Sequence, residues 1–340
     1  MKFSQWLGLI ALIITLTILW QIKEVLLLTF TAVVLATVLN RIVNFLTDRR
    51  KITRQLALIL TVFGLLLISA IFSLAIIPPF IEQFQELITK IPLGIEQLRT
   101  WFNIWSAQLP TPVQEGIENS LSRLIEIAQL FGSRILSNFF TIFSNTLNAL
   151  LSSFIVLVLT IMIVASPQDY KNVFILLFPK SFESKLKQML KEWEKAISGW
   201  SIAILFNMTV IGTLSWIGLL ILGVPLALAN GLLAGLLTFI PNVGPTLSVI
   251  PPAAIALMDA PWKGIAVIIL YVGIQQMESH VLTPLVMKKQ VSMLPAFAIL
   301  SQLIFAIFFG FLGLLLALPL ALTLQVIIKE FVIDEVMENL

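Results

Sequence analysis

The chain lacks cysteine altogether and has a single histidine, His280, among its 340 residues. Without cysteine it can form no disulfide, no zinc–thiolate site and no thiol nucleophile. No second histidine or acidic pair stands near His280, so zinc sites and histidine-based hydrolases are unsupported. No glycine-rich loop ends in Gly-Lys-Ser or Gly-Lys-Thr, the motif that holds ATP phosphates. We therefore expect neither an enzyme nor a bound cofactor or metal.

Charge is also scarce: 11% of the residues are charged and 59% are hydrophobic, whereas a soluble domain has about 25% charged residues. The stretches without Asp, Glu, Lys or Arg are 3–22, 25–40, 55–81, 135–168, 196–258 and 290–328. Most of them reach the roughly 20 residues that cross a bilayer as a helix. We predict an all-α, polytopic integral protein of the plasma (inner) membrane, with about six clear spans plus two helical hairpins in the C-terminal half. The net charge of +3 is too small and dispersed to indicate nucleic-acid binding.

The basic residues predict the orientation. The segment 41–54 carries five of them against one acid, Asp48, which places it in the cytoplasm. The expected regions are an N-terminal three-helix membrane region (1–78), an extracytoplasmic amphipathic helical region (79–138), a span (139–165), a cytoplasmic amphipathic helix (166–198), a transport core with two interrupted hairpins (199–330) and a cytoplasmic tail (331–340). The region 79–138 either lies on the membrane surface or packs against other subunits. The apolar stripe among the lysines of 166–198 predicts a helix lying on the anionic leaflet.

Two charge-free stretches of the C-terminal half are interrupted. Residues 225–258 contain Pro241-Asn242-Val243-Gly244-Pro245, which must break a helix. Because the neighbouring spans run in opposite directions, this stretch must start and end on the same side, either as a re-entrant hairpin or as two short crossings. Residues 290–328 contain Gly310 and Gly313 near their middle and present the same pattern in the opposite orientation. Paired interrupted segments are typical of transporter binding sites.

Polar residues inside the apolar sequence are the candidate site. Gln275, Gln276, Glu278 and His280 lie close together before Thr283-Pro284, and Gln276 and His280 are one helical turn apart. A carboxylate within a span is costly unless it faces a cavity or a partner. Glu278 either lines a proton, cation or solute pathway or sits at the cytoplasmic interface near Lys288.

A second candidate is Asn242, which either helps to bind an ion or solute at unwound backbone or merely caps the turn. Isolated polar residues, namely Asn207, Asn230 and Gln302, are expected to hydrogen-bond other helices.

Three motifs together resemble one known family. They are Phe239-Ile-Pro-Asn-Val-Gly-Pro245, Gln276-Met-Glu-Ser-His-Val-Leu-Thr-Pro284 and Phe309-Gly-Phe-Leu-Gly-Leu-Leu-Leu-Ala-Leu-Pro319. They look like the autoinducer-2 exporter (AI-2E) family, and the order of features resembles it over nearly the whole chain. The resemblance implies a permease-like secondary transporter that forms homo-oligomers.

Members of that family are linked to export of the signalling furanone autoinducer-2, and some to sodium–proton antiport. The residues that match its pattern are Pro241, Gly244, Pro245, Glu278, Pro284, Gly310, Gly313 and Pro319, with the prolines and glycines as expected helix breaks or hinges. Lys288 and Phe305-Ala306 stand where members often have glycine, which puts the substrate in doubt.

Three functions are consistent with these observations. The first is a secondary transporter, coupled to an ion gradient or permease-like, that exports a small polar solute such as autoinducer-2. The second is a sodium–proton antiporter. The third is a membrane scaffold that transports nothing and recruits partners through its amphipathic outer region. The expected partners are therefore a small-molecule solute, the lipid bilayer, Na⁺ or H⁺, and further copies of the chain.

Overall fold

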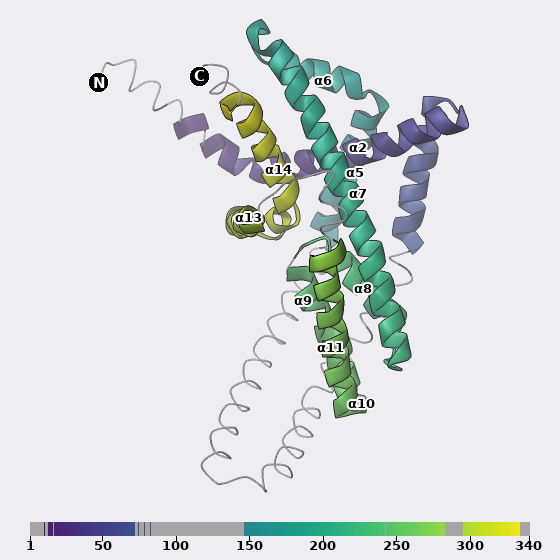
Figure 1. The fold of residues 1–340 in the computed structure, drawn as a ribbon. Coiled ribbons are helices and arrows are strands. Elements are labelled where there is room, and N and C mark those ends of the chain that lie inside the picture. The colour runs from purple at the N-terminus through teal and green to yellow at the C-terminus, as the bar shows by residue number, and fades with distance from the viewer. Residues whose placement is uncertain are drawn as a thin grey trace. The chain divides into compact units, whose positions relative to one another are not determined.

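The computed structural model describes residues 17–71, 146–241, 243–282 and 295–333, together with positions 10, 13–15, 74, 78 and 82. Every regular element in these ranges is a helix (Figure 1). The described residues belong to two compact units. Unit 1 combines residues from 1–66, 151–204 and 284–340, and unit 2 combines residues from 67–150 and 205–283. The amphipathic region predicted over 79–138 lies outside the described residues except for Glu82.

Unit 1 begins with helix α2, Lys23–Arg50, which follows a single turn residue at Ile22. It ends at Lys51, whose left-handed backbone (φ 53°) lets its N–H bond the Thr47 carbonyl as a C-cap. The helix Arg54–Ile71 starts three residues later. The predicted basic loop over 41–54 is therefore wrong in extent, because the loop covers only residues 51–53. Charged residues are adequate helix formers, so a helix can continue past the membrane into a basic stretch.

Helix α5, Thr146–Ala165, packs against α2, and small side chains bring the two together. Ala36, Val43, Ala57 and Val164 form a buried cluster shared by α2, the helix Arg54–Ile71 and α5. After α5 the chain bends by 93° at Ser166 into α6, Pro167–Leu176. Proline suits the first turn of α6, where an amide hydrogen would have no helical partner.

Helix α7, Glu183–Ile221, has 39 residues and follows a short 3₁₀ turn, Lys180–Phe182. At 1.5 Å per residue it is about 58 Å long, roughly twice the thickness of the hydrocarbon core. The prediction of a separate amphipathic helix that ends at residue 198 is therefore wrong, because residues 183–198 are the first half of α7. Part of its apolar stripe is buried inside the protein, since Leu186 and Ile197 are 2% and 0% exposed, whereas Phe182 is 43% exposed.

Unit 2 contains the second half of α7, then α8 (Ala227–Leu237), α9 (Val243–Ser248), α10 (Ile250–Asp259) and α11 (Pro261–Met277). Lys263 Nζ lies 3.8 Å from the position of a Cβ on Gly223, so the segment between them leaves and returns at the same end. This agrees with the predicted hairpin. Helix α8 has 11 residues and is about 16 Å long, too short to cross a bilayer.

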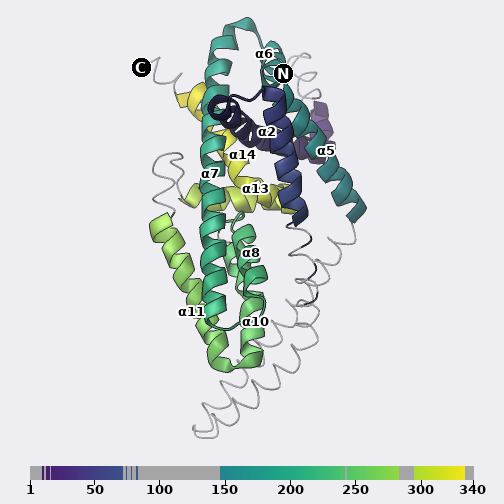
Figure 2. The ribbon, with the colours of Figure 1, turned by 90° about the vertical axis from the view of Figure 1, so that its right-hand side faces the viewer.

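The second interruption lies in unit 1, inside α13 (Pro295–Leu315), which is followed by α14 (Ala317–Ile328). The backbone of Gly310 leaves the helical region (φ 66°, ψ −144°), and Gly313 then lies against Phe305, where a Cβ would be 2.0 Å from the carbonyl oxygen. The chain thus turns back at Gly310, as predicted. Figure 1 shows α13 end-on and Figure 2 shows it lengthwise, while α14 appears lengthwise in both, so the two helices cross steeply.

Pro319 does not break a helix, contrary to the expectation for this residue. It is the third residue of α14, where its missing N–H costs no helical hydrogen bond, and Leu320 N–H already bonds the Leu316 carbonyl at 2.9 Å. Pro284, the other expected hinge, lies outside the described residues.

Five helices in the described part of the chain are long and apolar enough to cross a membrane, or six if α5 and the bent α6 count as one span. Their outward surfaces carry large apolar side chains such as Phe63, Ile68 and Ile307, which are 63%, 68% and 80% exposed. Water would not tolerate so many exposed apolar side chains, whereas lipid does. The protein is an all-α, multi-pass membrane protein, as predicted.

Candidate functional site

The polar cluster predicted before Pro284 lies at the C-terminal end of α11. The α-helix ends at Met277 and continues as a π-helical turn, η2, Glu278–Leu282. Glu278 is half-buried in this turn, while Gln276 and His280 are exposed. His280 Nδ1 lies 3.0 Å from the backbone carbonyl oxygen of Gln276, so these two residues are one turn apart as expected. Single π-helical turns are rare and are frequently found at functional sites.

Glu278 has no counter-charge among the residues that the structure describes. None of the ion pairs found there includes it, and the pairs that do form lie on α6, α7 and the α10–α11 junction. Leu282, in the same π-helical turn, is buried against Ile211 and Ile274 in the core of unit 2. A half-buried carboxylate without a cationic side chain is a place where a proton or a metal cation can bind.

The helix break between α8 and α9 is an ordered turn. Gly244 N–H bonds the Ile240 carbonyl at 2.9 Å, and Ile240 N–H bonds the Leu237 carbonyl at 2.9 Å. Gly244 is required for close approach, because a Cβ would lie 1.7 Å from the Leu237 carbonyl oxygen. Pro245 is buried and its carbonyl accepts a hydrogen bond from Ser248. Pro241 is half-buried in the same turn, and Asn242 lies outside the described residues.

The expected hinge and pathway residues therefore form separate groups. Gln275, Gln276, Glu278 and His280 are together at the end of α11 in unit 2. The residues Pro241, Gly244 and Pro245 form the α8–α9 turn of the same unit, and Gly310 and Gly313 form the turn in unit 1.

Buried polar residues in unit 2 are the group that sequence reasoning missed. Ser215 on α7 and Tyr271 on α11 were not singled out, although both stand in charge-free sequence. Asn207 and Asn230 were expected to hydrogen-bond other helices, but Asn230 Nδ2 donates to Leu226 in its own chain segment at 3.3 Å. Among the described residues, Asn207 Oδ1 and Asn230 Oδ1 are buried without a hydrogen-bond partner, whereas the buried hydroxyls of Ser215 and Tyr271 face each other.

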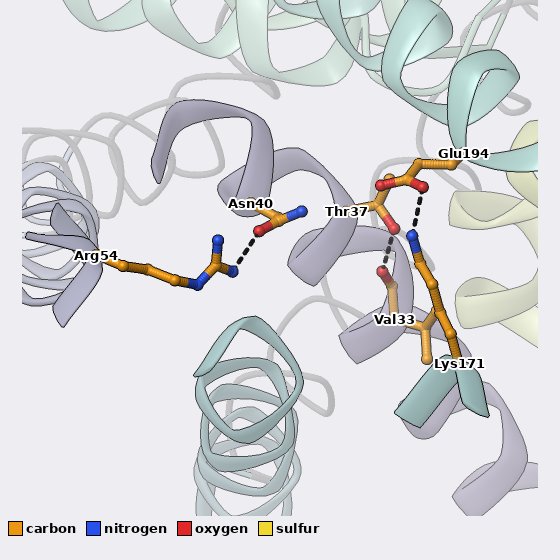
Figure 3. A network of polar contacts seen from close by, with 6 residues as sticks. All are labelled: Val33, Thr37, Asn40, Arg54, Lys171 and Glu194. Carbon is orange, nitrogen blue, oxygen red and sulfur yellow. Dashed lines mark hydrogen bonds and ion pairs between the residues drawn. The ribbon is translucent and has the colours of Figure 1, made fainter. Parts of the chain in front are cut away.

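A polar network in unit 1 is structural (Figure 3). Arg54 donates to Asn40 Oδ1 at 2.7 Å, to Asn44 Oδ1 at 3.0 Å and to the Val164 carbonyl at 2.9 Å. It thereby ties α2 to the last turn of α5, whose terminal carbonyls need donors. Lys171 of α6 pairs with Glu194 of α7 at 2.6 Å in the same view.

A family model for AI-2E family transporters matches residues 9–333. The chain belongs to the AI-2E family. Two relatives named for transport are similar over most of their length. YueF of Bacillus subtilis is 26% identical over 306 residues, covering 87% of this chain and 80% of YueF. The sll0060 protein of Synechocystis is 25% identical over 296 residues, covering 84% and 81% of the two chains.

A third relative of this AI-2E family transporter is the AI-2 transport protein TqsA of Escherichia coli, 28% identical over 122 residues, which are 36% of each chain. Family membership and the apolar helices together show that the protein is a multi-pass membrane transporter, which acts on a solute in a lipid bilayer. The family is one of transporters. In the described residues, no group of three or more His, Asp or Glu side chains is placed to hold a metal ion.

Proposed function

We propose that this protein is a secondary transporter of the plasma (inner) membrane that exports a small polar organic solute, with Glu278 as the residue that binds the coupling ion. The observation that carries the proposal is the position of Glu278. It is half-buried in a π-helical turn at the end of an apolar span, and it forms no ion pair among the described residues. Autoinducer-2 is the first solute to test, because TqsA is named for its transport.

The chemistry of a lone carboxylate explains how the coupling works. Burial favours the neutral, protonated form, whereas contact with water or Na⁺ favours the charged form. A carboxylate that meets the two sides of the membrane alternately therefore takes up an ion on one side and releases it on the other. The interrupted α8–α10 hairpin supports this reading, because interrupted helices line the solute sites of many transporters.

Sodium–proton antiport is the second candidate, since the same carboxylate can bind either ion. Homo-oligomer formation remains a prediction from the family resemblance. The scaffold hypothesis depends on residues 80–134, which fall almost wholly outside the described residues.

The test uses the full-length protein in proteoliposomes with the Glu278→Gln variant. We expect gradient-driven accumulation of autoinducer-2 to fall at least tenfold in the variant, because the amide cannot take up or release a proton. Exchange of the solute without a gradient should persist. Glu183→Gln is the matched control, since Glu183 pairs with Lys187 on the exposed surface of α7 and should leave flux unchanged. Unchanged accumulation in Glu278→Gln would remove the coupling role. Sodium-dependent proton movement without any organic solute would instead favour antiport.

A further inference from the structure

Helix α6 carries an apolar face that the described protein leaves bare. Four large side chains of α6 and its C-cap follow one another at intervals of three, four and seven residues, which places them on one side of the helix. They are Tyr170, Val173, Phe174 and Leu177, and they are 42%, 60%, 39% and 76% exposed. The ring of Phe178 lies 5.4 Å from that of Phe174 and extends the face beyond the end of the helix. A bare apolar face of this kind indicates a partner outside the described protein.

The other sides of α6 are accounted for. Lys171 Nζ pairs with Glu194 of α7 at 2.6 Å (Figure 3), which attaches α6 to the first half of α7. Pro167 and Ile175, one turn before and one turn after Lys171, are half-buried on the same side. Asn172 is exposed on a polar edge that points away from the apolar face. Helix α6 therefore has a packed side, a polar edge and an apolar face without a partner.

The direction of α6 follows from α5. Helix α5 has 20 mostly apolar residues, enough to cross a bilayer, and it exposes large apolar side chains such as Phe154 and Met162. The chain then bends by 93° at Ser166 into α6. A helix at nearly a right angle to a span runs along the membrane surface and not through it. With ten residues, α6 is about 15 Å long and could not cross by itself.

The surroundings of the apolar face are basic. Residues 167–195 contain six lysines against four acidic residues. Three of the acids are already paired with lysines, in the pairs Lys171–Glu194, Lys187–Glu183 and Lys195–Glu192. Lys180 is exposed two residues after Phe178 and forms no ion pair with the described residues. Lysines beside an apolar face favour the cytoplasmic leaflet, which carries the acidic headgroups.

We propose that α6 lies in the cytoplasmic leaflet, with its apolar face at the boundary between headgroups and acyl chains. An amphipathic helix buries its apolar side at this depth and keeps its polar side in water. A second copy of the chain is a poorer occupant, because four side chains offer much less than the roughly 800 Å² that each partner buries in a stable interface. The proposal goes beyond the proposed function, since it involves neither the solute nor the coupling ion.

The test uses single cysteines, because the chain has no cysteine of its own. Val173→Cys and Leu177→Cys place a spin label on the apolar face, and Asn172→Cys is the matched control on the polar edge. The full-length protein is studied in nanodiscs of phosphatidylcholine with one quarter phosphatidylglycerol. Oxygen concentrates in lipid and a charged nickel complex stays in water. We expect the ratio of oxygen to nickel accessibility to be about fivefold higher at positions 173 and 177 than at 172, since only the apolar face enters lipid.

A second measurement identifies the leaflet. In Asn172→Cys, a membrane-impermeant maleimide should label the protein in inside-out vesicles and not in right-side-out vesicles. Labelling only in right-side-out vesicles would overturn the proposal.

The spin labels can also contradict it in two ways. Equal accessibility ratios at positions 172 and 173 would show that the apolar face lies in water. Immobile labels at 173 and 177 that neither reagent reaches would show that protein covers the face, as a second copy of the chain would.

Discussion

The two interrupted hairpins differ in what holds each break in place. In the α8–α9 turn, Gly244 is buried and packs directly on backbone, where a Cβ would lie 1.7 Å from the Leu237 carbonyl oxygen. In the α13 turn, Gly310 has no neighbouring atom within 4 Å of a Cβ position, but its backbone conformation (φ 66°, ψ −144°) is one that residues with side chains rarely adopt. The first break therefore depends on packing, and the second depends on backbone conformation.

The second break is also stabilised by a side chain from another helix, Lys23 of α2. The described residues provide no such contact at the first break. Lys23 Nζ donates to the Phe308 carbonyl at 3.3 Å, which satisfies one of the oxygens left without a partner where the helix stops. The same ammonium lies 4.1 Å from the centre of the Trp20 ring, and Trp20 packs edge-on against Phe308. A cation near a helix C-terminus is favourable, so Lys23 acts as a cap for the broken helix. The comparison shows that glycine at a helix break in an apolar run can be needed for two different physical reasons, namely close packing or an unusual backbone conformation.

The largest effect should come from Gly244→Ala. The new methyl group cannot fit beside the Leu237 carbonyl, so the turn must open, and we expect a loss of about 3 kcal/mol in stability. The melting temperature in detergent should fall by roughly 5–10 °C, and flux should fall with it. Gly273→Ala on α11 is the control, because no atom lies within 4 Å of its Cβ position. A melting temperature equal to that of the control would show that packing does not maintain this turn.

Substitution of Gly310 should have an intermediate effect of about 1–3 kcal/mol, because the strain lies in the backbone alone. We expect Gly310→Ala and Gly310→Ser to lower the melting temperature equally, whereas at Gly244 serine should be worse than alanine. Gly64→Ala, which also has open space around it, should leave the melting temperature unchanged. If the loss at Gly310 grew with side-chain size, the distinction between the two breaks would disappear.

The smallest effect should come from Lys23→Met, which removes the cap on the Phe308 carbonyl. We expect a local loss of about 1 kcal/mol, since one hydrogen bond and one cation–π contact are lost at a partly exposed site. Hydrogen exchange of the peptide around Gly310 should become about fivefold faster. Lys187→Met, in an exposed ion pair on α7, should not change exchange there. Identical exchange in both variants would mean that the second turn needs no cap.

The sequence predicted the helical class and the positions of both breaks, because scarce charge and clustered proline and glycine have direct physical consequences. It was less reliable on helix ends. Helix α2 continues through Arg49 and Arg50, and α7 continues through the lysine-rich stretch, since a charged residue ends a membrane span but not a helix. Pro319 was expected to break a helix and instead lies in a first turn, where proline is tolerated.

The candidate site was predicted in part. The grouping of Gln275, Gln276, Glu278 and His280 follows from their closeness in sequence, but the π-helical turn that holds Glu278 has no recognisable sequence signal. The buried pair Ser215 and Tyr271 was missed because its members belong to different helices, α7 and α11, which are far apart in the sequence. Each of them looks like an isolated polar residue until the helices are packed together.

Composition and order along the chain were enough to predict that this protein is embedded in lipid, that it has about six membrane-spanning helices, and where two apolar stretches must break. These are properties of single segments, and solvent and backbone chemistry decide them locally. Only the tertiary structure decided which carbonyl Lys23 caps, why Gly244 has no room for a side chain, and that the buried Ser215 and Tyr271 face each other. Those facts depend on contacts between segments far apart in the chain, and no local pattern specifies such contacts.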